Sequence, residues 1–167
     1  MPCTKREAEA GNAVAQYNLG CCYANGSGVA VDKAEAVKWY KRAAEAGDAA
    51  SQYALGFSYA NGDGASVDKA EAVKWYKHAA EAGYANAQTQ LGGCYFTGSG
   101  VAVDKAEAVK WYKRAAEAGH AIAQSQLGGC YFNGSGVAVD KAEAVKWWKR
   151  AADAGDADAL KMLQSMK

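Results

Sequence analysis

The sequence lacks three features that would assign it to particular classes of protein. It contains no apolar run of the roughly 18 residues needed to span a bilayer. Its formal net charge is only +1, from 19 basic and 18 acidic residues, so it has no concentrated basic surface for nucleic acid or a membrane. Its two histidines, His78 and His120, have no companion ligand at metal-binding spacing. We therefore expect no metal, no nucleic-acid partner and no membrane partner.

What the sequence does contain is one block that occurs four times. The stretch KAEAVKWYKRAAEAG at residues 33–47 recurs, with few changes, at residues 69–83, 105–119 and 141–155. A fixed period of this length is typical of a solenoid, in which each unit buries its apolar face only against its neighbours. We interpret the repeated tryptophans as packing residues between helices. They are Trp39, Trp75, Trp111 and Trp147.

Each unit predicts two helices joined by a tight turn. In the first unit, helix A is expected at residues 13–24 and helix B at residues 33–46. The joining stretch at residues 25–28 contains two glycines, which can adopt the positive φ that a tight turn requires. Asp32 begins helix B as an N-cap, in an Asp-x-x-Glu pattern that resembles a capping box, and Gly47 ends it.

The period also divides the chain into segments. We predict a single repeat domain over residues 1–167, with atypical elements at both ends, as the capping of a stack requires. The predicted segments are a partial helix at 1–10, repeats at 11–46, 47–82, 83–118 and 119–154, and a C-terminal capping helix at 155–167.

The unit AxAQxxLGxxYxxGxGVxxDxxxAVKWYxxAAxxG resembles the Sel1-like repeat, a relative of the tetratricopeptide repeat. In the first unit its positions run from Ala13 to Gly47. The resemblance implies an all-α fold, a right-handed α-solenoid of antiparallel helix pairs, and a non-enzymatic role as a protein-interaction scaffold. Disulfide-rich bacterial relatives pair a cysteine of helix A with one of helix B. Helix B has no cysteine here, so the resemblance implies a different subtype.

The five cysteines are an odd number, so at least one is free or pairs between molecules. Cys22, Cys94 and Cys130 occupy equivalent positions in their units, where helices roughly 8 to 10 Å apart exceed the ~7 Å that a disulfide can bridge. We interpret these three as small buried residues, and Cys21 as a more exposed thiol. The start, MPCTKREAEAG, lacks the apolar core of a signal peptide. We therefore expect a cytoplasmic chain with reduced thiols, and a removed or unrecognised leader is the alternative.

Comparison of the units divides helix A into two halves. At roughly 100° per residue, the positions that stay the same fall on one side of the helix and those that change on the other. A packing face has to repeat in a regular stack, so we interpret the changing half as a concave binding groove. The alternatives are that these positions vary because nothing touches them, or that some are half-buried between neighbouring A helices. The predicted binding residues are Val14, Tyr17, Asn18, Cys21, Ala50, Tyr53, Ala54, Phe57, Asn86, Thr89, Gln90, Phe96, Ile122, Ser125, Gln126 and Phe132.

The changing half of helix A carries no Lys, Arg, Asp or Glu in the four full units. A neutral, partly apolar peptide or helix is therefore the expected partner. We expect no cofactor, because the Gly26-Ser-Gly28 stretch lacks the third glycine of a dinucleotide loop, and no catalysis, because no nucleophile stands beside a histidine base. The chain is expected to be a monomer or to self-associate weakly. Two further hypotheses are a designed or duplicated stack without a partner, and a regulatory domain of a larger protein.

Overall fold

The computed structural model describes residues 5–167, which form ten helices and contain no strand within that range. The chain divides into two compact units, one ending at Tyr84 and the other beginning at Ala85. The first unit contains α1 (Lys5–Glu9), α2 (Ala13–Asn25), α3 (Lys33–Glu45), α4 (Ala49–Asn61) and α5 (Lys69–Glu81). The second unit contains α6 (Ala85–Thr97), α7 (Lys105–Glu117), α8 (Ala121–Asn133), α9 (Lys141–Asp153) and α10 (Ala157–Ser165).

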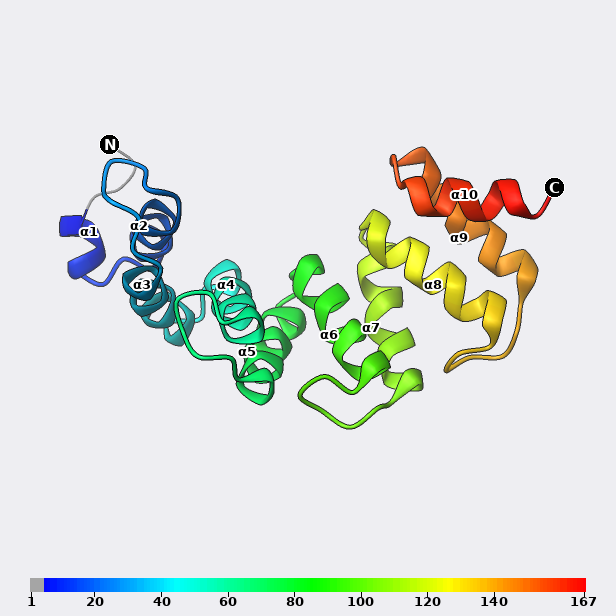
Figure 1. Ribbon diagram of the computed structural model, residues 1–167, viewed down its shortest axis with the longest axis horizontal. Helices are drawn as coiled ribbons and strands as arrows, with labels where there is room; N and C mark the ends of the chain where they lie inside the picture. Colours follow the sequence, from blue (N-terminus) through cyan, green and yellow to red (C-terminus); the bar gives the residue numbers. More distant parts are fainter. Residues whose placement is uncertain (1–4) are drawn as a thin grey trace. The chain divides into compact units, whose positions relative to one another are not determined.

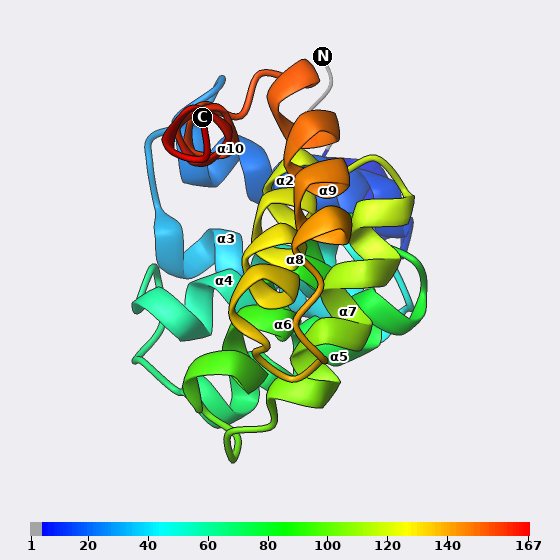
Figure 2. The same ribbon diagram turned by 90° about the vertical axis from the view of Figure 1, so that its right-hand side faces the viewer.

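Within each unit, consecutive helices pack side by side as hairpins. In the first unit α2 packs on α3 and α4 on α5 (Figure 1), and in the second α7, α8 and α9 lie next to one another (Figure 2). The predicted helices A and B of the first repeat are confirmed to within one residue at their ends. The predicted partial helix begins before Lys5, so its first four residues lie outside the described residues.

The start of each helix B follows from one aspartate. The Asp32 carboxylate accepts a hydrogen bond from the Glu35 backbone N–H at 3.0 Å, which satisfies one of the free donors of α3. The same bond of 3.0 Å starts α5, α7 and α9. The Asp32 N–H donates to the Tyr23 carbonyl at 2.8 Å, and the Glu35 carboxylate pairs with Lys38 at 3.5 Å. The aspartate half of the predicted capping box is therefore confirmed.

The half of helix A that stays the same between units is the half that packs. Leu19, Leu55, Leu91 and Leu127 are at most 2 % exposed. The glycine after each leucine lies against an aromatic ring of helix B. An ideal Cβ atom on Gly20 would stand 2.6 Å from the Tyr40 ring, and one on Gly128 would stand 2.5 Å from the Trp148 ring. Glycine at this position therefore lets helices A and B approach closely.

Three of the four repeated tryptophans are buried, as the packing interpretation predicts. Trp39, Trp111 and Trp147 are 4 to 6 % exposed. Trp75 is only half-buried. The second repeat therefore differs from the others at a position where the sequence is the same.

Two adjacent glycines of α8 give a paired test of this packing. Gly128→Ala should lower the free energy of unfolding by about 1–3 kcal/mol, because the new methyl group overlaps the buried Trp148 ring. Gly129→Ala should raise it by about 0.5–1 kcal/mol, because nothing lies within 4 Å of a Cβ atom there and alanine favours the helix. Urea unfolding followed by circular dichroism measures both. Equal effects of the two substitutions would contradict the close approach.

Candidate functional site

A pocket of about 300 Å³ opens between α2, α3 and α4 of the first unit. We call it the aromatic pocket. Four of the predicted binding residues line it, namely Tyr17, Tyr53, Ala54 and Phe57. The sequence did not indicate the remaining lining residues, which are Ala24, Lys33, Ala36, Tyr40, Ser58, Asp63 and Tyr84. The structure thus brings part of the predicted set together and adds a wall from α3.

The walls of the aromatic pocket are rings in contact with one another. The Tyr17 and Tyr40 ring centroids are 5.9 Å apart, and those of Tyr53 and Tyr84 are 5.3 Å apart. Such tilted pairs are favourable and hold the rings in fixed positions. Phe57 is 43 % exposed, which is unusual for a phenylalanine in a helix of this stack. The pocket therefore offers a preformed surface made mostly of aromatic rings.

The tyrosines of the α2 and α3 walls keep their protons at neutral pH. Burial, followed by a hydrogen bond with Cys21, raises the pKa of Tyr17 to about 12. Burial also raises the pKa of Tyr40. The Tyr40 hydroxyl donates a hydrogen bond to the Cys21 Sγ atom at 3.6 Å. The thiol of Cys21 thus lies behind the wall, as a contact of the tyrosine.

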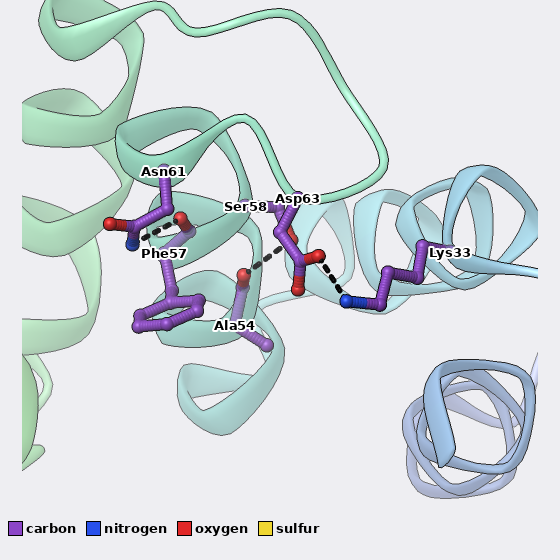
Figure 3. Close-up of polar contacts among 6 residues, drawn as sticks. All are labelled: Lys33, Ala54, Phe57, Ser58, Asn61 and Asp63. Atoms are coloured by element: carbon purple, nitrogen blue, oxygen red, sulfur yellow. Dashed lines mark hydrogen bonds and ion pairs between the residues drawn. The ribbon is translucent and has the colours of Figure 1, made fainter.

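The charged groups of the aromatic pocket neutralise each other. Lys33 Nζ lies 2.7 Å from Asp63 Oδ1, and both side chains are partly exposed (Figure 3). Nearby polar groups bond to the backbone of α4: the Ser58 hydroxyl donates to the Ala54 carbonyl, and the Asn61 amide donates to the Phe57 carbonyl, each at 3.0 Å. The Phe57 ring is left as an apolar surface beside a compensated ion pair.

One residue that lines the aromatic pocket, Ala24, has a larger counterpart in the third repeat. Ala24 packs beside Ala36 and Tyr40 in the first unit. The equivalent residue of the third repeat is Phe96, which packs against the core of the second unit. Lys105 Nζ lies 5.1 Å from the centre of the Phe96 ring. An alanine in place of that ring leaves room in the first repeat, and a comparison of the two positions in the sequence could have indicated it.

The other predicted binding residues lie in varied surroundings. Phe132 packs on Trp148 with centroids 5.4 Å apart, and Lys141 lies 5.2 Å from its ring centre. The Ser125 carbonyl accepts a hydrogen bond from Trp148 Nε1 at 3.1 Å. The exposed ones are Val14, Asn86, Gln90, Ile122 and Gln126. The half-buried ones include Asn18, Cys21 and Ala50.

A model of the Sel1 repeat matches residues 13–48, 49–84, 85–120 and 121–156, which together make up most of the chain. The chain belongs to the Sel1 repeat family. Each matched repeat begins two residues after the corresponding predicted segment. The division into one domain with terminal elements stays a prediction.

Solved structures of Sel1 repeat proteins resemble the chain closely. A structure of c5321, described as a protective antigen of uropathogenic Escherichia coli with an SLR fold, is 44% identical, with a TM-score of 0.94 over 97% of this chain and 35% of that one. A Sel1 repeat protein from Oxalobacter formigenes is 40% identical, with a TM-score of 0.86 over 93% of this chain and 62% of that one. The chain thus spans less than two thirds of either relative.

The fold extends to a more distant structure. Cysteine rich protein B of Helicobacter pylori is 24% identical, with a TM-score of 0.63 over 83% of this chain and 99% of that one. These matches confirm the predicted all-α solenoid of helix pairs. No curated protein matches the chain significantly. Among the described residues, no helix is long and apolar enough to cross a membrane.

The cysteines of this Sel1 repeat protein differ from the expectation in one respect. Cys22 is disulfide-bonded, so the prediction that the thiols are reduced is wrong for that residue. The distance argument covered only disulfides between equivalent positions of the repeats. Cys22 and Cys130 are buried and Cys94 is half-buried. Burial raises the pKa of Cys130 to about 11, so its thiol stays protonated.

Two predicted binding residues, Asn86 and Thr89, instead hold a histidine of the second unit. His120 Nε2 lies 2.6 Å from Asn86 Oδ1, and His120 Nδ1 lies 3.0 Å from Thr89 Oγ1. Nδ1 also accepts a hydrogen bond from the Ala123 N–H at 3.4 Å, which makes His120 the N-cap of α8. Because an amide oxygen only accepts, Nε2 carries the proton of the neutral ring. The arrangement therefore requires an uncharged imidazole.

Burial lowers the pKa of His120 below its ordinary value of 6.5. Protonation at Nδ1 would remove the acceptor of the cap and place a positive charge at a helix N-terminus. A histidine whose pKa is lower in the folded state contributes stability above its unfolded pKa. That contribution is lost as the pH falls below about 6.5 and through the folded pKa.

His120→Asn should remove this pH dependence and keep the cap, as Asn12 caps α2 through its Oδ1 atom. Between about pH 7 and pH 5, the unfolding midpoint of the native chain should fall with pH, and that of the variant should fall less. Denaturant titrations at several pH values measure the difference. His78→Asn is measured in parallel, because it changes the other histidine and so separates the loss of any histidine from the loss of His120. Parallel profiles for native chain and His120→Asn would contradict the assignment.

Proposed function

We propose that this Sel1 repeat protein is a non-enzymatic scaffold whose first unit binds a neutral, partly apolar peptide, one side chain of which enters the aromatic pocket. Sel1 repeat proteins generally act as protein-interaction scaffolds. The observation that carries the proposal is the pocket of about 300 Å³ walled by Tyr17, Tyr53 and Phe57. Its volume is at the lower end of ligand pockets, which favours one side chain over a larger small molecule.

The charges of the pocket favour a neutral occupant. Its charged lining residues among those described, Lys33 and Asp63, form an ion pair with each other at 2.7 Å. A charged ligand group would have to compete with that pair, whereas an apolar group gains contact with the rings and leaves the pair intact. An extended or helical peptide with an aromatic or large aliphatic anchor fits this chemistry.

The rigid aromatic walls also favour binding without rearrangement. Tyr40, Ala36 and Ala54 pack with Leu55 in the core below the pocket. The surface is therefore preformed by the packing that stabilises the fold, and little ordering entropy is lost on binding. In our proposal the chain works as a monomer, and its first unit holds the peptide.

Ala24→Phe tests the pocket with a residue that the chain itself uses at the equivalent position 96. A random peptide library displayed on phage is selected on the immobilised chain, and the enriched peptides are synthesised. They should share an aromatic or large aliphatic residue, and Ala24→Phe should weaken their binding at least about tenfold, because the ring fills the pocket. Fluorescence anisotropy of labelled peptides measures the affinity.

Ala60→Phe is the matched control, since it places the same ring at the equivalent position of the second repeat, outside the pocket. It should leave the affinity unchanged. The double variant Tyr53→Ala with Phe57→Ala should also lose binding while circular dichroism shows a folded chain. No enrichment of peptides, or equal binding by Ala24→Phe and the native chain, would contradict the proposal.

A further inference from the structure

In three repeats, the tryptophan of helix B is covered by an arginine of the same helix. The guanidinium carbon lies 4.7 to 4.8 Å from the ring centroid in the pairs Arg42–Trp39, Arg114–Trp111 and Arg150–Trp147. The indole face attracts a cation through its quadrupole, and the attraction is stronger where water is excluded. These tryptophans are 4 to 6 % exposed. Each of these repeats therefore has a cation-binding ring face that is occupied by an arginine of the same helix.

The second repeat lacks this internal cation. His78 occupies the position of the arginine, and its ring lies tilted on Trp75 with centroids 5.6 Å apart. Trp75 is half-buried, unlike its three counterparts. A pocket of about 350 Å³ lies here, lined by Ala44, Glu45, Gly47, Gln52, Trp75 and His78. We call it the Trp75 pocket.

The polar groups of the Trp75 pocket suit a donor with positive charge. Glu45 supplies a carboxylate, and it is the last residue of α3, where the helix dipole is negative. Gln52 is 8 % exposed, and its Nε2 donates to the Ala44 carbonyl at 3.2 Å. Its Oε1 atom has no hydrogen-bond partner among the described residues. Gln16 and Gln124 share this arrangement, but Gln52 lines an open pocket beside a half-buried tryptophan.

We propose that the Trp75 pocket binds a guanidinium group, the side chain of an arginine on a protein partner. The guanidinium would stack on the indole of Trp75, as the arginines of the other repeats do, and donate to the carboxylate of Glu45. The carboxylate of Glu45 disfavours a phosphate or carboxylate ligand. This site differs from the aromatic pocket in its residues and in its ligand, so it stands or fails independently of the proposed peptide site.

The test follows the indole N–H signal of Trp75 by NMR in the ¹⁵N-labelled full chain. The probe is N-acetyl-arginine methylamide, and N-acetyl-citrulline methylamide is its neutral isostere. The arginine probe should shift the Trp75 signal in a saturable manner and the citrulline probe should not. Glu45→Gln should weaken the apparent affinity at least about threefold, because one charge-assisted hydrogen bond is lost. An unmoved Trp75 signal, or equal shifts with both probes, would overturn the proposal.

Two variants exchange histidine and arginine between equivalent positions of the repeats. Each new residue already occurs at that position in another repeat, so we expect both variants to fold. His78→Arg restores the internal cation and should reduce the affinity for the arginine probe at least about tenfold. Arg150→His removes the internal cation of the fourth repeat and should create an equivalent site in the second unit. Glu117 and Gln124 occupy the positions of Glu45 and Gln52 there. The Trp147 signal, insensitive in the native chain, should then respond to the probe. Undiminished binding by His78→Arg, or a silent Trp147 in folded Arg150→His, would overturn the assignment.

Discussion

The contact between a glycine of helix A and an aromatic ring of helix B is the constraint on which the rest of the structure depends. A Cβ atom on Gly56 would stand 2.8 Å from the Tyr76 ring, and the other repeats have the same close approach. This approach buries the neighbouring leucine completely and fixes which side of helix A packs. The opposite side varies more between repeats, because the close approach at the glycine does not constrain it. The packing requirement on one half of helix A thus leaves the other half as the place where residues can differ between repeats and take part in binding.

The same ring links stability to the candidate site. Tyr40 packs on Gly20 and in the core with Leu55, and its ring also lines the aromatic pocket. Its hydroxyl is held by Cys21. The wall of the pocket is therefore as rigid as the core to which it belongs. Recognition at such a surface depends on what fits a fixed shape more than on rearrangement.

Local and periodic features could be predicted from the sequence, because they depend on a few residues close together. The caps at Asp32 and its equivalents, the turn glycines and the buried half of helix A are examples. The aromatic pocket could be predicted only in part. Its α3 wall includes Lys33 and Tyr40, which recur in other repeats and so carry no signal of variation. Whether an identical residue is buried or lines a pocket depends on its neighbour at position 24 or 96, which is a tertiary effect.

Both candidate sites of the first unit occur where a repeat has a smaller side chain than its counterparts. Ala24 stands where the third and fourth repeats have a phenylalanine, and His78 stands where the other three repeats have an arginine. In each case the surrounding framework recurs, including the tyrosine or tryptophan that the larger side chain would touch. Because the repeats are alike, a repeat with a smaller side chain still has the residues that pack against the larger side chain in the other repeats. We propose that the space left by the larger side chain is a site for a ligand group of the same chemistry. That group is an apolar ring at the position of Ala24 and a guanidinium at the position of His78.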